Sequence, residues 1–351
     1  MADARPRQVQ GAGHTRRPRC RFRYRADARL RRPGRGGPVT SSGALPQLSG
    51  ARVLVTGGDG LIGAAVVTHL VADGAEVTVL DREVAAAPVT GVRRLTGSVT
   101  DRAVVADAVA GQDAVVHLAG RAGLDRGGPA DIYTDNALGT FLVLQASADA
   151  AVRKVVYASS INAFGLPLNA RPVLPSRYPW DEDEPADIGD AYSLSKQANE
   201  AAALMFARRE GLSMTGLRYP LVRDIREDGG AVFGRHIRAA LREDPRRQAC
   251  EGWTYLDVRD AAAATAAALT HETPAAPGIL VAAPRTYLRQ STAQALARHA
   301  PTVPSGDIPG RDVPVRLDRA RELLEFEAAV FLEDVDPDLL ADLDEASGAD
   351  R

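Results

Sequence analysis

A tyrosine and a lysine four positions apart are the residues of this sequence best suited to chemistry. Tyr192 and Lys196 stand in the string YSLSK at the start of a helical pattern, so both side chains project from one face of the helix. A phenol transfers protons poorly at neutral pH unless a nearby cation stabilises its phenolate, and Lys196 would supply that cation. The pair therefore indicates acid–base catalysis by Tyr192, assisted by Lys196.

A hydroxyl close to this pair would complete such a site, because the reacting oxygen needs a hydrogen-bond donor. The string VVYASSINAFG ends an expected strand with two serines, at the edge of an open sheet where ligands bind. We choose Ser160 as the substrate-binding hydroxyl. Ser159 is the alternative, and its other role would be local hydrogen bonding at the strand end.

A glycine-rich turn upstream predicts a dinucleotide site. Gly57, Gly60 and Gly63 stand between an expected strand at 52–56 and an expected helix at 61–72. Glycines in this position allow a tight turn, close approach of the backbone to a pyrophosphate and close packing of the helix on the strand. The unpaired N–H groups of the helix would receive the anion.

An acidic residue after the second expected strand favours NAD as the cofactor. Asp81 follows Gly57 by 24 positions, where a carboxylate can accept hydrogen bonds from the ribose hydroxyls and would repel a 2′-phosphate. The neighbouring Arg82 could instead bind that phosphate. We therefore predict NAD, with NADP as the alternative.

The hydrophobic pattern predicts how these residues are positioned. From residue 51 onward, short Val/Leu runs alternate with Ala-rich helical stretches, which is typical of β-α-β units. The expected strands are 52–56, 76–80, 92–96, 114–118, 152–158 and 213–218, with helices at 61–72, 101–110, 133–150 and 192–210. Residues 50–219 are thus expected to form a Rossmann-type α/β domain, with a doubly wound parallel sheet that binds NAD(P).

The remaining parts of the chain have different patterns. Residues 220–332 are expected to form a smaller substrate-binding lobe interleaved with the Rossmann domain, with a helix near 260–269, a strand at 279–282 and a helix at 317–324. Residues 1–49 contain 12 Arg and two acidic residues. They are predicted to be a disordered basic extension, because they cannot bury enough apolar surface. Residues 333–351 are expected to be an acidic, flexible tail.

Composition excludes several classes of protein. No stretch approaches the roughly 18 consecutive apolar residues of a membrane span, and the Arg-rich start lacks the apolar core of a secretory signal. We expect a soluble, cytoplasmic protein that binds neither nucleic acid nor membrane. The six histidines show no metal-ligand spacing, so no metal site is predicted. Cys20 and Cys250 are not expected to form a disulfide.

Together these residues resemble the extended short-chain dehydrogenase/reductases, the NAD-dependent epimerase/dehydratase family, over roughly residues 51–330. The resemblance is carried by strings that occur in the family's order, namely VTGGDGLIG, VVHLAG, NALGTFLVLQAS, KVVYASS, DEDEPADIGDAYSLSK and TYLDVRDAAAA. It implies that Ser160 binds substrate, that Tyr192 is the acid/base and that Lys196 is its partner.

The resemblance also implies further cofactor contacts and an assembly. Asn136 matches a family asparagine near the active centre, although an asparagine at a helix start can simply be a cap. Ser98 stands where relatives often have an aspartate near the adenine. Other cofactor contacts are expected next to the strand ends, at Val99, Leu118 and Ala119. The family implies a homodimer through the helices at 133–150 and 192–210.

Departures from the family pattern narrow the substrate. Ile161 and Asn162 follow Ser160 where nucleotide-sugar dehydratases usually carry Asp-Glu, which disfavours elimination of water. Many enzymes that act on nucleotide sugars carry an Asn and a Tyr-Gly-Pro after the sixth strand, where this chain has Leu221 and Val222. This departure disfavours a diphosphate-linked substrate. Three arginines could still bind an anionic substrate, namely Arg218, Arg223 and Arg226.

We therefore expect an NAD(P)-dependent oxidoreductase that transfers hydride at a carbinol or carbonyl carbon. Its substrate would be a sugar, a sugar acid or a related small molecule. A nucleotide-sugar 4-epimerase is the alternative within the family. A non-catalytic NAD(P)-binding sensor or scaffold is the alternative from another class, although such proteins often lose the tyrosine or lysine that this chain keeps.

Overall fold

The computed structural model describes residues 43–273 and 276–344, and the described chain belongs to one compact unit. Residues 1–42 of the predicted disordered extension, with Cys20, lie outside the described residues. Residues 43–49 were included in that prediction wrongly. Ala44, Leu45 and Leu48 are buried, and the Leu45 N–H donates to the carbonyl oxygen of Leu269 (2.9 Å).

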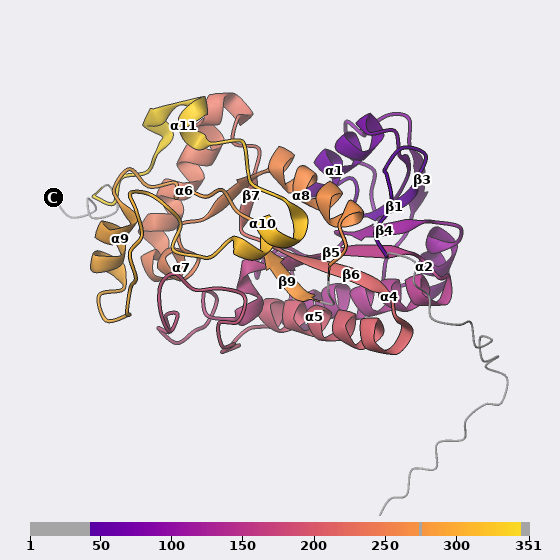
Figure 1. Ribbon diagram of the computed structural model, residues 1–351, viewed down its shortest axis with the longest axis horizontal. Helices are drawn as coiled ribbons and strands as arrows, with labels where there is room; N and C mark the ends of the chain where they lie inside the picture. The colour runs from indigo at the N-terminus through magenta and orange to yellow at the C-terminus, as the bar shows by residue number, and fades with distance from the viewer. Residues whose placement is uncertain (1–42, 274–275, 345–351) are drawn as a thin grey trace, which may run out of the picture. The chain divides into compact units, whose positions relative to one another are not determined.

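A seven-stranded parallel sheet forms the centre of the molecule (Figure 1). Its strands, in the order β3-β2-β1-β4-β5-β6-β9, are β3 (Arg93–Thr96), β2 (Glu76–Asp81), β1 (Arg52–Thr56), β4 (Ala114–His117), β5 (Lys154–Ser160), β6 (Ser213–Tyr219) and β9 (Ala276–Leu280). This confirms the predicted Rossmann-type, doubly wound sheet. The strand expected at 279–282 was assigned to the lobe, but β9 joins the main sheet beside β6.

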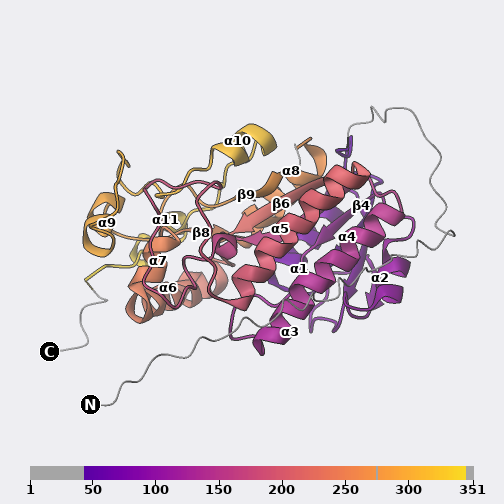
Figure 2. The same ribbon diagram turned by 90° about the horizontal axis from the view of Figure 1, so that it is seen from below.

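Helices cover both faces of this sheet, because successive strand residues point to opposite sides. Val53 and Val55 of β1 pack in one apolar cluster with α1 (Leu61–Ala72) and α8 (Val258–Thr270). Leu54 belongs to the cluster on the other face, under α2, α4 and α5. Those helices are α2 (Arg102–Val109), α4 (Gly139–Asp149) and α5 (Ala191–Glu210). Figure 2 shows α4 and α5 side by side over the sheet.

The helix predicted at 133–150 is not continuous. It consists of α3 (Pro129–Tyr133), one π-helical turn (Thr134–Leu138) and α4. Single π turns inside helices often mark functional sites, and this one contains Asn136. Hydrophobic periodicity cannot reveal such a turn, because it adds only one residue to a run that still looks helical.

The smaller lobe is built from residues after β6. A two-stranded sheet of β7 (Leu221–Arg223) and β8 (Tyr255–Asp257) connects it to the main sheet, and its apolar core is continuous with that of the α1 face. The helix expected at 260–269 is α8, which covers the main sheet instead of the lobe. The helices of the lobe are α6 (Ala231–Glu243), α7 (Pro245–Cys250), α9 (Thr292–His299), α10 (Asp318–Leu324) and α11 (Leu332–Val335), with short 3-10 turns at Glu227–Gly230 and Pro337–Leu339.

The acidic end of the chain is folded as far as residue 344, so the prediction of a flexible tail from residue 333 was wrong for residues 333–344. Leu339, Ala341 and Leu343 are buried, and Ala341 pairs with Leu288 in an isolated bridge. Glu333 binds Arg285 (2.9 Å) and Arg311 (2.6 Å). Charge alone suggested solvent exposure, but the interspersed leucines supply an apolar face that packs on the lobe.

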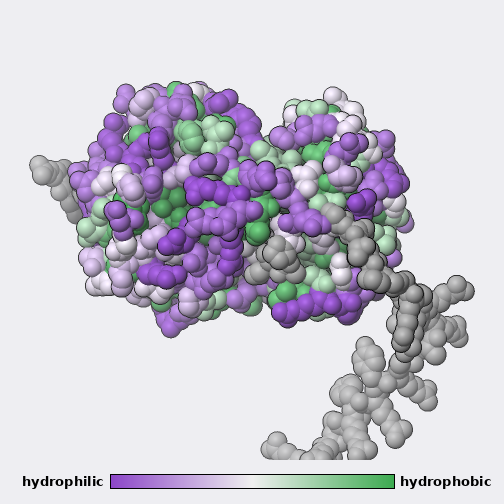
Figure 3. Space-filling model, viewed as in Figure 1, coloured by the Kyte–Doolittle hydropathy of each residue, from purple (hydrophilic) through white to green (hydrophobic). Residues whose placement is uncertain are grey.

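Hydrophilic side chains dominate the face shown in Figure 3, where hydrophobic ones lie in small separate groups. Among the described residues, none of the helices combines the length and the apolar character that crossing a bilayer requires.

The close contact between Gly63 and Gly57 in the glycine turn can be tested by substitution. A Cβ on Gly63 would lie 2.0 Å from the carbonyl oxygen of Gly57, so α1 and β1 would have to separate. We expect Gly63→Ala to lower the free energy of unfolding by about 1–3 kcal/mol, as overpacking of a rigid contact does. Urea denaturation measures this change.

Gly60→Ala is the matched control, because its Cβ would meet only the Gly57 oxygen, at 3.3 Å. Equal stability of the two variants would contradict the close contact.

Candidate functional site

The predicted cofactor segments converge between β1 and β4, where the strand order reverses. Gly57 directly follows β1 and has a φ of +73°, and a Cβ there would lie 2.6 Å from the backbone nitrogen of Ala119. The Leu118 N–H donates to the carbonyl oxygen of Thr56 (3.0 Å). The glycine turn and the segment after β4 therefore touch through their backbones.

The start of α1 suits a pyrophosphate. Gly60 is its N-cap and offers no side-chain cap, and the first turn of the helix contains no acidic residue. The first N–H groups of a helix lack partners within the helix and attract anions. The residues present thus fit the phosphates of a dinucleotide.

Asp81 and Arg82 are both engaged at the end of β2. The Asp81 carboxylate accepts hydrogen bonds from the backbone N–H groups of Asp59 (3.1 Å) and Arg82 (2.7 Å), which fixes it beside the glycine turn. The Arg82 guanidinium pairs with Asp135 (3.2 Å), which also binds Arg121 (2.7 Å). Because Arg82 already has a carboxylate partner, the arrangement favours ribose hydroxyls over a 2′-phosphate.

Ser98 and Val99 follow β3 at the same edge of the sheet. The Ser98 and Thr100 hydroxyls are hydrogen-bonded to each other (2.8 Å). Val99 is buried, and one of its methyl groups lies 2.8 Å from where a Cβ on Gly139 would be, so it packs against the start of α4. The pair shapes this edge of the sheet mainly through packing.

Ser160, Tyr192 and Lys196 come together at the carboxyl end of β5. Ser160 is the last residue of β5, and Tyr192 lies in the first turn of α5. The Lys196 ammonium donates to the carbonyl oxygen of Ala158 (3.0 Å) and lies 5.7 Å from the centre of the Tyr192 ring. All three predicted catalytic residues are buried.

Burial shifts the pKa values of both ionisable groups in this set. Burial lowers the pKa of Lys196 to about 8, although the nearby charge of Glu200 acts in the opposite direction. It raises the pKa of the Tyr192 phenol, whereas a hydrogen-bonding interaction with Ser160 lowers it. Tyr192 is therefore a proton donor at neutral pH, and Ser160 supports its ionised form.

The contacts of Ser159 and Arg218 show that both side chains are bound within the protein. Ser159 donates to Glu200 (2.6 Å), which binds Arg218 through both carboxylate oxygens (2.9 and 2.8 Å). Arg218 is 6% exposed, so the expectation that it could bind an anionic substrate was wrong. Ser159 belongs to this internal cluster, which leaves Ser160 as the hydroxyl beside Tyr192.

Asn136 holds α5 to the loop after β4. Its carboxamide accepts a hydrogen bond from the Arg121 N–H (2.7 Å) and donates to the Arg121 carbonyl oxygen and the Ser195 hydroxyl (both 3.1 Å). The Ser195 hydroxyl in turn donates to the carbonyl oxygen of Tyr192 (2.7 Å). The carboxamide of Asn136 is thus occupied by the protein itself, and it positions Tyr192 from behind.

A second buried chain of hydrogen bonds, which the sequence did not predict, links the glycine turn to α5. His117 bonds Thr56 (2.7 Å) through Nδ1 and Thr140 (2.9 Å) through Nε2, and burial lowers its pKa to about 3, so the ring is neutral. Thr140 donates to the Asn199 carboxamide (3.0 Å). Since the Thr140 hydrogen is used there, Nε2 of His117 must carry the ring proton.

Two further side chains at the site were not singled out as binding residues. The Asn162 carboxamide oxygen is buried and has no hydrogen-bond partner among the described residues, while the Asn162 N–H donates to the Ser160 hydroxyl (3.1 Å). Arg247 of α7 interacts electrostatically with Tyr192 and pairs with Glu251 (2.9 Å). An unpaired carboxamide has no sequence signal, and Arg247 is one arginine among many.

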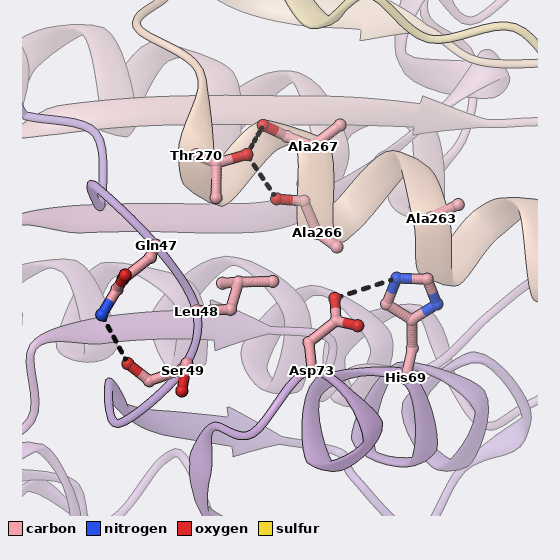
Figure 4. Close-up of a pocket in the computed structure, with 9 residues that line it drawn as sticks. All are labelled: Gln47, Leu48, Ser49, His69, Asp73, Ala263, Ala266, Ala267 and Thr270. Atoms are coloured by element: carbon pink, nitrogen blue, oxygen red, sulfur yellow. Dashed lines mark hydrogen bonds and ion pairs between the residues drawn. The ribbon is translucent and has the colours of Figure 1, made fainter.

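The cavity in Figure 4 is separate from these residues. It has a volume of about 500 Å³ and is lined by residues 47–49, the end of α1 and α8. The His69 ring and the Asp73 carboxylate lie 3.5 Å apart at its wall. Neither the glycine turn nor the Tyr192–Lys196 pair contributes to its lining. Within the described part of the chain, no group of three or more His, Cys, Asp or Glu could hold a metal ion.

Comparisons with known proteins agree with this geometry. The family described as the NAD dependent epimerase/dehydratase family matches residues 53–283, more than half of the chain. A dTDP-glucose 4,6-dehydratase of Streptomyces niveus is 32% identical over 185 residues, which are 48% of this chain and 52% of that protein. A UDP-glucose 4-epimerase of Lactobacillus helveticus is 30% identical over 190 residues, 51% of this chain and 54% of that protein.

These matches to curated relatives cover only about half the length of each. A solved structure aligns more fully. It is a short-chain dehydrogenase/reductase superfamily protein from Agrobacterium tumefaciens with bound NAD, which is 25% identical, with a TM-score of 0.61 over 84% of this chain and 96% of that one.

The scarcity of lysine allows a direct test of the site's electrostatics. Lys154 and Lys196 are the only lysines, and burial lowers the pKa of each to about 8. In protein labelled with ¹³C-lysine, we expect two Cε resonances that titrate near pH 8, well below the value of about 10.4 for a solvated lysine. The Lys196→Arg variant assigns the two resonances, because it removes the signal of Lys196. A signal that titrates near pH 10.4, in the wild type or in the variant, would argue against the enclosed site.

Proposed function

The chain belongs to the NAD dependent epimerase/dehydratase family, and from this we propose that it is an NAD-dependent enzyme that oxidises a carbinol or reduces a carbonyl group of a sugar or a related small molecule. One observation carries the proposal. Tyr192, Ser160 and Lys196 meet at the carboxyl edge of the sheet, beside the turn that fits a dinucleotide.

The residues that would hold NAD are distributed along this edge. The N–H groups at the start of α1 would bind the pyrophosphate, and Asp81 would accept hydrogen bonds from the adenosine ribose hydroxyls. Ser98, Val99, Leu118 and Ala119 would line the remainder of the cleft. Lys196, with one hydrogen bond to Ala158, keeps donors for the second ribose. When bound, NAD supplies a nicotinamide ring that accepts or returns hydride.

The protein's own residues handle the proton and the oxygen. Tyr192 donates a proton to the oxygen during reduction and takes it back during oxidation. Ser160 donates a hydrogen bond to the same oxygen, which keeps it next to the phenol. Lys196 stabilises the phenolate, because an ammonium nearby favours the charged form.

The buried carboxamide of Asn162 supports a substrate rich in hydroxyl groups. Its oxygen lacks a partner among the residues that the structure describes, and a buried polar atom without a hydrogen bond is costly. Asn162 also stands where an acidic residue would be needed for elimination of water, so a dehydratase reaction is disfavoured. A nucleotide-sugar 4-epimerase is the second candidate, since the same residues could return hydride to the opposite face of a carbonyl.

Removal of the phenol tests the catalytic assignment. We expect Tyr192→Phe to reduce turnover by about 10²–10⁴-fold, the usual contribution of a general acid–base group. NAD affinity, measured by calorimetry, should stay within about twofold, because the phenol is assigned to the substrate oxygen.

Absorbance of the reduced nicotinamide separates the two candidate reactions. Stoichiometric NADH indicates a dehydrogenase, whereas isomer conversion without NADH indicates an epimerase. Unchanged turnover in Tyr192→Phe would refute the role of this residue. A wild-type protein that binds NAD without turning over any alcohol would instead support the sensor or scaffold alternative.

We also propose that two copies associate through α4 and α5. Four of the seven large hydrophobic side chains exposed in the described chain lie on α5 or on the segment from α3 to α4, namely Tyr133, Leu138, Phe141 and Leu194. The ring of Phe141 packs against Phe206 of α5 (5.3 Å), so the two helices share a surface. Exposed apolar groups on neighbouring helices favour association.

Charge introduced into this surface tests the association. We expect wild-type protein to sediment as a dimer and Phe141→Asp/Leu194→Asp to sediment as a monomer, because burial of two carboxylates is unfavourable. Val84→Asp is the control, since Val84 is 54% exposed but lies on neither helix. A monomeric wild type would contradict the proposal.

A further inference from the structure

Arg223 is a partly buried cation that forms no ion pair with a carboxylate in the described part of the chain. It ends β7, and its guanidinium donates a hydrogen bond to the carbonyl oxygen of its neighbour Val222 (2.8 Å). Asp257 stands opposite it in β8, but the Asp257 carboxylate binds Arg259 instead (2.6 and 2.7 Å). Within the described residues, Arg223 therefore has no ion-pair partner.

A guanidinium in this situation is costly. Removing a charge from water is unfavourable unless an opposite charge or several hydrogen bonds compensate. Burial lowers the pKa of Arg223, and the like charge of Arg126 lowers it further, against the carboxylate of Glu227. Arg126 comes from the loop between β4 and α3, so two cations approach from the nucleotide-binding part and from the lobe.

Other charged groups extend this cluster to Tyr192. His236 of α6 faces Arg223 and Arg247, whose charges add to burial in lowering its pKa, and Glu243 opposes them. Arg247 is compensated by Glu251 (2.9 Å) and, more weakly, by Asp244, and it lies within electrostatic range of Tyr192. The carboxylates near the cluster thus compensate Arg247 far more than Arg223.

We propose that Arg223 binds an anionic group of the substrate, a carboxylate or a phosphate. The planar guanidinium can donate two parallel hydrogen bonds to either group, and the nearby charge of Arg126 adds to the attraction. The substrate is then a sugar acid or a phosphorylated sugar, held with its reacting carbon at Tyr192. This inference rests on the proposed function, since it assigns part of the substrate of the same site.

Arg226 provides a matched control three residues away. It is exposed and was an equal candidate for anion binding in the sequence, but it is not among the charges that act on Arg223 or on His236. Arg223→Gln and Arg226→Gln remove the same charge from the same segment. Arg223→Lys keeps the charge but loses the bidentate geometry.

Calorimetry on NAD-saturated protein tests the proposal with four probes: D-glucuronate, D-glucose 6-phosphate, UDP-glucose and neutral D-glucose. We expect at least one anionic probe to bind more tightly than D-glucose, and Arg223→Gln to weaken it about 10- to 100-fold, with an intermediate effect for Arg223→Lys and none for Arg226→Gln. The probe affected identifies a carboxylate, a phosphate monoester or a diphosphate as the anion.

Two controls keep the inference separate from the proposed function. NAD titration of each variant should give the wild-type affinity, and thermal unfolding should show that Arg223→Gln is folded. Wild-type protein that binds NAD but prefers no anionic probe over D-glucose overturns the anion site alone. Equal anion affinity of wild type and Arg223→Gln overturns it as well. Loss of NAD binding by the wild type would instead refute the proposed function.

Discussion

The arrangement of the site depends on one buried ammonium that joins a helix to a strand. Lys196 is enclosed and donates to the carbonyl oxygen of Ala158 near the end of β5. Burial disfavours its charge and lowers its pKa to about 8, so packing elsewhere must offset the cost of holding it there. The result is that Tyr192, one turn earlier in α5, lies beside Ser160. A lysine with such a pKa can also exchange protons near neutral pH, as residues at active sites often do.

Two buried polar clusters keep α5 in that place. Glu200, one turn beyond Lys196, binds Arg218 of β6 and Ser159 of β5, which ties the helix to two strands. The chain from Thr56 through His117 and Thr140 to Asn199 connects the same helix to the glycine turn. Because the groups in these clusters depend on one another for hydrogen bonds, loss of one leaves another unpaired in a low-dielectric interior. Buried hydrogen bonds therefore join the glycine turn to the helix that carries Tyr192 and Lys196.

The two halves of the site relate differently to known relatives. The glycine turn and the Tyr192–Lys196 pair follow the pattern of the family, and the family match extends over residues 53–283. The groups on the substrate side depart from that pattern, with Asn162 after Ser160 and Leu221 after β6. Curated relatives match over about half of their length, so their substrates cannot be transferred to this chain. Asn162 and Arg223, whose polar groups lack such partners within residues 43–273 and 276–344, are better guides to its substrate.

The sequence by itself determined the features that depend on neighbours in the chain. The periodicity of hydrophobic residues predicted the observed bounds of α1, and it predicted the bounds of the first six strands to within about two residues. The glycine spacing identified the turn. Only the tertiary structure decided which polar residues are free. Arg218 and Arg223 look alike in the sequence. Glu200 of α5 binds Arg218, whereas Arg223 has no ion-pair partner among the residues described. The π turn at Asn136 and the folded acidic end likewise depend on partners far away in the chain, which local patterns cannot specify.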